Sequence, residues 1–376
     1  MRLRPSFAAL AFSFAVSPVF SAIQPALSAG LAGAFAIPSA ADLPAQCEAT
    51  LARAHRRIGA LKAIPPGRRS AASLLGDWNR FQMEVDDLKG PLELASETHP
   101  DPALRAAAEA CSLKLSALDA EYFQSEALYG LFKAARGKDE VERENLSRIL
   151  ESFDERGVGL TAERRAQARA LFERLDALAQ EFSRNVRDEK TMLAFTEAEL
   201  AGVPAAYLAK AKRDGESKYL IGLDYPDAEA VLENASVEAT RERFYRAFNR
   251  RGGEKNLAIL AEVVQKWQEL ATLFGEKNYA ALTLKHRMAG SVEAVDHFLA
   301  EVARQVAPVE EREIAQLIAL KRRESGNPDA VFRRWDLRYF EQKFKRERFH
   351  VDPSVVRAQF PHEPTVRWLL DVSAHL

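Results

Sequence analysis

Apolar side chains recur every three or four residues through most of this chain, and this spacing limits its fold more than any other feature. One such run follows Thr161, a residue type that commonly starts a helix. Its members would share one side of a helix: Leu171, Leu175, Leu178 and Phe182. A second run stops before Gly275 and contains Leu260, Val263, Val264, Trp267, Leu270, Ala271 and Phe274. Because about 3.6 residues make one helical turn, the sequence predicts an all-α fold whose apolar stripes pack into a core.

Two further helices are predicted before residue 328. Ser291 is placed to cap the first of them, and its apolar positions are Val295, Phe298, Leu299, Val302 and Val306. The second opens with Ile314, Leu317 and Ile318 and is ended by the glycine and proline of residues 325–328. We therefore expect an elongated lobe built from many helices.

One short segment departs from the helical rhythm. Residues 218–224 are apolar and β-prone, and Tyr225 and Pro226 close the segment, which predicts a strand. Its partner is expected near residues 193–196. The sequence thus predicts a small β insertion within residues 193–224 of an otherwise helical protein.

The first residues differ in composition from the rest of the chain. Arg2 and Arg4 precede an apolar run over residues 7–16, and the small residues Ala34 and Ala36 suit a cleavage site. This pattern is typical of a secretory signal peptide, so residues 1–36 are expected to be removed on export to a periplasmic or extracellular space. The alternative is a membrane anchor. Prolines interrupt the stretch, however, and a spanning helix needs ~20 continuous apolar residues, so we expect no membrane contact after cleavage.

Both cysteines, Cys47 and Cys111, lie beyond the predicted cleavage point. In an oxidising compartment a disulfide between them would stabilise the fold. Cys111 also lies in an alanine-rich helical run, where a buried thiol would be equally ordinary. The sequence leaves both interpretations open, and the spacing fits neither a zinc ribbon nor a CxxC redox pair.

The charges of the chain are balanced. It has 53 Lys and Arg residues against 54 Asp and Glu residues, which gives a formal net charge of −1. Such a chain has no overall attraction for a polyanion, so we expect no nucleic-acid partner.

Several segments, in their order and spacing, resemble the thimet oligopeptidase, neurolysin and oligopeptidase A family of zinc metallopeptidases. The segments are 96–105, 153–160, 181–185, 199–204, 241–256, 278–288, 335–340, 351–352 and 359–361. Together they extend from about His99 to the end of the sequence. The resemblance implies an all-α fold in which two lobes flank a deep channel. It also implies zinc as the cofactor and short unstructured peptides as substrates.

The zinc chemistry of such peptidases needs a particular histidine spacing. In the HExxH motif two histidines one turn apart bind the metal, and the glutamate activates its water. The histidines of this sequence are His55, His99, His286, His297, His350, His362 and His375. No two of them are four residues apart. His362 is followed by a glutamate, but Val366 stands where the second histidine would be, and Pro364 is expected to break a helix there. The sequence therefore assigns no catalytic, cofactor-binding or metal-binding residue.

The resemblance places the HExxH helix beyond Leu376. We expect a signal peptide at 1–36, an N-terminal helical region at 37–137 and a channel-wall region at 138–376. These residues would be the substrate-channel portion of an exported zinc metallo-oligopeptidase, and they would be inactive without its catalytic half. The alternative is a non-catalytic helical module that binds peptides or proteins. In either case we expect an exposed apolar surface that promotes self-association.

Overall fold

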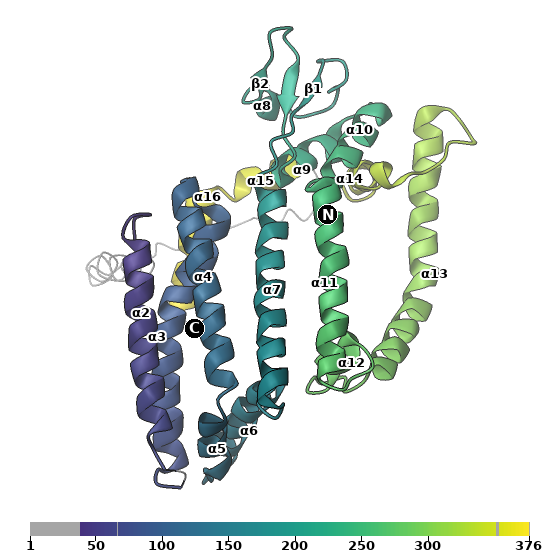
Figure 1. The fold of residues 1–376 in the computed structure, drawn as a ribbon. Coiled ribbons are helices and arrows are strands. Elements are labelled where there is room, and N and C mark those ends of the chain that lie inside the picture. Colours follow the sequence, from purple (N-terminus) through teal and green to yellow (C-terminus); the bar gives the residue numbers. More distant parts are fainter. Residues whose placement is uncertain (1–37, 66, 351–352, 376) are drawn as a thin grey trace, which may run out of the picture. The chain divides into compact units, whose positions relative to one another are not determined.

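The computed structural model describes residues 38–65, 67–350 and 353–375, and most of its regular structure is helical (Figure 1). The predicted all-α fold with a small β insertion is confirmed. The predicted signal peptide lies outside the described residues. None of the described helices combines the length and the apolar content needed to cross a membrane.

The chain divides into two compact units, Met1–Ala177 and Leu178–Leu376. The division falls inside one continuous helix, α7 (Ala162–Arg187). The limits expected from the sequence after residues 36 and 137 stay predictions.

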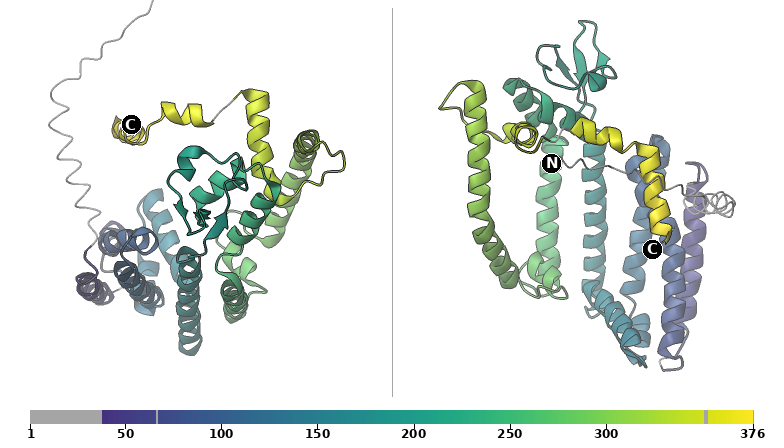
Figure 2. Two further views of the ribbon diagram at one scale, coloured as in Figure 1. Left: turned by 90° about the horizontal axis from the view of Figure 1, so that it is seen from above. Right: turned by 180° about the vertical axis from the view of Figure 1, so that it is seen from behind.

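The first unit is a bundle in which α2, α3 and α4 pack against one another (Figures 1 and 2). Besides the first part of α7, it contains α2 (Leu43–Lys62), α3 (Ala71–Thr98), α4 (Pro102–Phe123), α5 (Glu126–Ala134) and α6 (Glu140–Glu155). Four of these helices begin after a serine or aspartate whose side chain accepts a hydrogen bond from the first turn. These caps satisfy backbone donors that a helix start would otherwise leave unpaired.

Aromatic rings fill the core of the first unit. The Trp78 ring lies between 5.1 and 6.2 Å, centroid to centroid, from those of Phe81, Tyr122, Phe123, Phe132 and Phe153. In the same core, Cys47 of α2 and Cys111 of α4 form a disulfide, with their Cα atoms 6.0 Å apart. Both cysteines are buried. The structure thus selects the disulfide from the two interpretations that the sequence left open.

A carboxylate on α3 joins that helix to α2. The side chain of Glu84 accepts a hydrogen bond from Arg53 Nε at 2.6 Å and another from Arg57 Nε. Partial burial by itself would raise the pKa of Glu84, but the two guanidinium groups lower this pKa below its ordinary value of 4.5.

Replacing Glu84 with glutamine is expected to destabilise the first unit in a pH-dependent way. Because the folded-state pKa is lowered, the ionised carboxylate stabilises the fold at every pH above its ordinary pKa. This contribution is lost as the pH falls through the lowered folded-state value. Urea unfolding from pH 7 down to pH 3 should therefore show a gap between the native protein and Glu84→Gln that closes in acid. Glu93→Gln is the control, since Glu93 is exposed and lies 3.9 Å from its partner Lys89. A gap that does not change with pH would contradict the expectation.

The second unit contains helices of very different length and a small sheet. The helices after α7 are α8 (Ala205–Leu208), α9 (Tyr225–Asn234), α10 (Glu238–Phe248), α11 (Gly253–Leu273), α12 (Tyr279–Leu284), α13 (Val292–Ser325), α14 (Leu337–Phe349), α15 (Pro353–Gln359) and α16 (His362–His375). A short 3-10 helix, η1 (Arg334–Asp336), precedes α14. Figures 1 and 2 show α11 and α13 joined at one end through α12, which contacts both.

The sheet confirms the predicted strand pairing. Strand β3 (Tyr219–Ile221) pairs antiparallel with β1 (Leu193–Phe195), so that Ala194 lies opposite Leu220. On its other side β3 pairs with β2 (Lys212–Arg213), which the sequence did not predict. Lys212 and Arg213 are both charged, so they show no apolar alternation from which a strand could be predicted. They belong to the sheet through backbone pairing with β3.

The two helices predicted on either side of Pro308 are one continuous helix, α13. Ser291 caps it as expected, since its hydroxyl accepts a hydrogen bond from the Ala294 N–H at 3.1 Å. Pro308 removes one donor from the helix interior, but its fixed φ is itself helical, so the chain continues on both sides. The predicted separation into two helices is therefore wrong.

The prediction that the apolar stripes pack into a core is wrong for parts of α11 and α13. Leu270 and Leu317 are buried as expected, but Leu260 is 48% exposed. In the first half of α13, Phe298 and Leu299 are 65% and 55% exposed. Periodicity reveals that a helix has an apolar face and does not reveal what covers it. These side chains leave an apolar surface exposed, and the self-association expected from such a surface stays a prediction.

Candidate functional site

A buried ionic cluster is the most highly organised polar feature of the second unit. Arg241 of α10 and Asp336 of η1 are 2% and 0% exposed, and Arg241 Nη2 lies 2.8 Å from Asp336 Oδ1. From α13, Lys321 Nζ lies 2.7 Å from the second oxygen, Asp336 Oδ2. The cluster thus joins α10 to α13 and η1, and Arg241 and Asp336 are 95 residues apart in the sequence.

Neighbouring groups satisfy almost every polar atom of this cluster. The guanidinium of Arg241 also donates to the carbonyls of Ala235 and Ser236, at 2.8 and 3.0 Å. Lys321 Nζ donates to the Val331 carbonyl and lies 2.9 Å from Glu238 Oε2. Two cations and two carboxylates therefore balance. Among the described residues, the Nε of Arg241 is buried without a hydrogen-bond partner, and the other charged atoms of the cluster are paired, which suits a structural joint.

Two aromatic residues of α14 lie beside the cluster in a small buried core. Tyr339 and Phe340 are each 4% exposed, and the guanidinium carbon of Arg241 lies 4.3 Å from the centre of the Tyr339 ring. Trp335 is half-buried, and its Nε1 donates to Glu238 Oε1 at 3.2 Å. Neither Arg241 nor Asp336 was predicted from the sequence to lie beside these aromatic rings. The sequence feature that could have identified Arg241 and Asp336 is their position in two of the segments that carry the family resemblance.

Other segments of the resemblance also serve as structural joints. Between α3 and α4, Arg105 Nη1 donates to the carbonyls of His99 and Pro100, at 2.8 and 3.2 Å, and so fixes the turn. His99 lies in this connecting loop.

A comparable joint lies at the start of α11. The Asn185 side chain donates to Asn256 Oδ1 at 2.8 Å, and Asn256 Nδ2 donates to the Phe182 carbonyl at 3.1 Å. Gly252 lies beside this amide with a left-handed φ of 75°. A Cβ atom there would approach Asn256 Nδ2 to 2.3 Å, so the position requires glycine.

The histidines do not form a zinc site in the part of the chain that the structure describes. His55 Nε2 lies 3.0 Å from Glu121 Oε2, and its Nδ1 lies 2.8 Å from the Leu51 carbonyl. Nowhere among the described residues do three or more histidine, cysteine or acidic side chains form a group that could hold a metal ion. These residues therefore do not fit the zinc that the family resemblance implies, and we derive no catalytic step through a metal.

The expected effect of Pro364 on the local helix is wrong. Helix α16 begins at His362, so the proline lies in its first turn. The N–H groups of a first turn have no partner within the helix, so a proline is tolerated there. Val366 still occupies the position at which HExxH has its second histidine.

Comparison with known proteins agrees with the family resemblance over most of the chain. Residues 231–376 match the model of Peptidase family M3. Oligopeptidase A of Escherichia coli is 31% identical over 314 residues, which cover 77% of this chain and 46% of that protein. Saccharolysin of Saccharomyces cerevisiae is 26% identical over 81% of this chain and 45% of its own length. The thimet-like oligopeptidase of Dictyostelium discoideum is 23% identical over 82% of this chain and 48% of its own length. The chain therefore spans less than half the length of these relatives.

Proposed function

We propose, from its resemblance to the thimet oligopeptidase, neurolysin and oligopeptidase A family, that this chain forms the peptide-accommodating part of a metallo-oligopeptidase. The observation that supports this most strongly is the match with proteins named as oligopeptidases across about three quarters of the chain or more. The substrate class is short, unstructured peptides. Hydrolysis would depend on zinc held by ligands that the described residues lack, so we assign these residues binding and no bond-breaking step.

The exposed apolar faces of α11 and α13 are the proposed peptide-contacting surface. On α11 its residues are Leu257, Leu260 and Val264, and on α13 they are Phe298, Leu299, Val302, Val306 and Val309. Their spacing places each set along one side of its helix. An extended peptide with apolar side chains would remove these surfaces from water, and that transfer is favourable.

Replacing Leu299 with aspartate is expected to weaken binding of a labelled decapeptide with apolar side chains by about tenfold, since one buried leucine contact is lost and a charge is added. Leu94→Asp on α3 is a matched control, because Leu94 is 56% exposed and Leu299 is 55% exposed. Fluorescence anisotropy measures the dissociation constants, and circular dichroism checks that both variants keep their helices. Equal affinities of the native protein and Leu299→Asp would contradict the proposal.

The same samples test hydrolysis. A quenched fluorescent peptide should remain intact when it is incubated with this chain, with or without added zinc. One tightly held zinc ion per chain, or cleavage that a chelator abolishes, would overturn the assignment of binding alone. Coding sequence for an HExxH helix after the codon of Leu376 would support the oligopeptidase over a non-catalytic binding module.

Export and self-association are further parts of the proposal. The disulfide between Cys47 and Cys111 suits an oxidising compartment, which agrees with a cleavable signal at residues 1–36. Mass spectrometry of the mature N-terminus would test this, and an intact Met1 on cytosolic protein would refute it.

The exposed apolar faces also favour association between copies. Sedimentation should detect association that increases with concentration and is lost in Leu299→Asp.

A further inference from the structure

The two parts of α13 on either side of Pro308 differ in how they are packed. All of the buried residues of this helix follow the proline: Leu317, Leu320 and Lys321. None of residues 292–307, all of which the structure describes, is buried. We call residues 292–307 the arm. The arm is thus a helix without a packed face.

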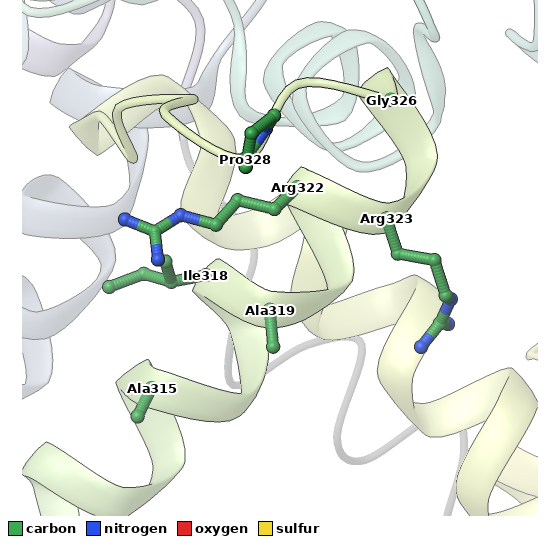
Figure 3. A pocket seen from close by; sticks show the side chains of 7 residues that line it. All are labelled: Ala315, Ile318, Ala319, Arg322, Arg323, Gly326 and Pro328. Atoms are coloured by element: carbon green, nitrogen blue, oxygen red, sulfur yellow. The ribbon is translucent and has the colours of Figure 1, made fainter.

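The part after the proline is anchored by several contacts. Leu317 and Leu320 pack against aromatic rings of α14, and Lys321 belongs to the buried ionic cluster. Arg323 Nη2 lies 2.5 Å from Glu347 Oε2 of α14. Figure 3 shows the unpacked face of this part, an open depression whose lining includes Ala315, Ile318 and Arg322. One face is therefore fixed to the core of the second unit.

Pro308 weakens the helix where these two parts meet. A proline has no N–H, so the Arg304 carbonyl loses the hydrogen bond that a regular helix would give it, and the proline ring crowds this carbonyl. Helices commonly bend at such positions. In Figures 1 and 2, α13 is not straight and curves toward α12 along the arm.

Helix α3 shows that a proline alone does not create a hinge. It contains Pro91, but Leu88 before this proline and Leu92 after it are both buried. Packing on both sides fixes the relative direction of the two parts of α3. In α13 only one side is packed in this way. Segments with few buried contacts move at a low cost in free energy.

The other end of the arm is also weakly held. The chain enters α13 from α12 through residues 287–290, which are exposed. Gly290 has a left-handed φ of 70°, and a Cβ atom there would meet nothing within 4 Å. Helix α12 itself is attached to α11, because the rings of Tyr279 and Trp267 stack with their centres 4.9 Å apart. The arm therefore lies between an exposed turn and a proline.

We propose that the arm pivots about Pro308 and closes on a peptide bound to the apolar faces of α11 and α13. This inference rests on the proposed peptide-binding function. The arm carries most of the apolar side chains assigned to that surface on α13: Phe298, Leu299, Val302 and Val306. A peptide that contacts α11 and the arm together binds the closed arrangement more tightly than the open one. This difference in affinity shifts the population toward closure.

Distances between pairs of spin labels, measured by electron paramagnetic resonance, test the pivot. Each pair has one label on α14, at the exposed position of Arg348→Cys. The second label is on the arm, at Ala300→Cys, or in the anchored part, at Ala319→Cys. The native cysteines form a buried disulfide and should not take up label. Without peptide, the distance distribution to residue 300 should be broader than that to residue 319.

Two proline variants test whether Pro308 is the pivot. Pro308→Ala restores the backbone hydrogen bond to Arg304 and should narrow the distribution at residue 300 to the width at residue 319. Pro91→Ala, also inside a helix, is the matched control and should leave both widths unchanged. Alanine favours a helix far more than proline does, so both variants should fold, and circular dichroism checks this. Equal widths at the two positions in the native protein, or no narrowing in Pro308→Ala, would overturn the pivot.

The decapeptide with apolar side chains tests closure. At a saturating concentration it should narrow the distribution at residue 300 of the native protein and leave that at residue 319 unchanged. If the peptide binds by fluorescence anisotropy and the distribution at residue 300 does not change, the peptide-binding function stands and closure is wrong. If the peptide does not bind, the proposed function is wrong and closure on a peptide fails with it.

Discussion

Replacing Asp336 with asparagine is expected to destabilise the second unit by about 3–5 kcal/mol, the largest effect that we predict for a single side chain. Asparagine keeps the shape of aspartate and removes the charge. Arg241 and Lys321, both buried, would then share no buried counter-charge. Removal of one partner from a buried ion pair costs more than the pair contributes, because the remaining charge stays out of water.

The measurement is urea unfolding followed by circular dichroism. Asp329→Asn is the control, since Asp329 is an exposed residue of the loop after α13. A combined variant, Arg241→Leu with Lys321→Met and Asp336→Leu, separates charge from packing. Because apolar groups can replace a buried ionic cluster with little cost, this variant should recover much of the stability that Asp336→Asn loses. If Asp336→Asn unfolds at the same urea concentration as Asp329→Asn, the cluster does not stabilise the fold.

Removing the disulfide by replacing Cys47 and Cys111 with serine is expected to cost the first unit about 4 kcal/mol. The two cysteines are 64 residues apart in sequence, and a crosslink over such a loop restricts the unfolded chain strongly. The two serines would also leave hydroxyl groups in a region where both cysteines are buried.

Urea unfolding with and without a reducing agent tests the contribution of the disulfide. The reducing agent should lower the midpoint of the native protein and leave that of the double variant unchanged. A native protein whose midpoint is the same under both conditions would show that the crosslink contributes nothing to the equilibrium. Cys47→Ala with Cys111→Ala separates loss of the crosslink from the effect of the two hydroxyl groups.

Local patterns in the sequence predicted individual elements well. Ser291 caps α13, α11 ends before Gly275, and the strand at residues 219–221 pairs with residues 193–195. Each of these features depends on residues that are close in sequence or on a single short pairing. The extent of helices was predicted less well, since two helices were expected where α13 is one, and Pro364 was expected to break a helix that begins at His362.

Contacts between distant residues could not be predicted in this way. Arg241 and Asp336 are 95 residues apart, and a charged residue in a polar segment is usually solvated. The exposure of Phe298 could not be predicted for the same reason. The spacing of apolar residues identifies a helix face, and only the tertiary structure decides whether that face is covered.

The passage of α7 through the boundary at residues 177 and 178 affects how the chain can be divided. Domains are usually connected by exposed, irregular segments that proteases cut and that gene truncations can use. Here, either proteolysis or gene truncation at residues 177 and 178 would cut through a hydrogen-bonded helix. Shortened versions intended to isolate either half should therefore retain the whole of Ala162–Arg187.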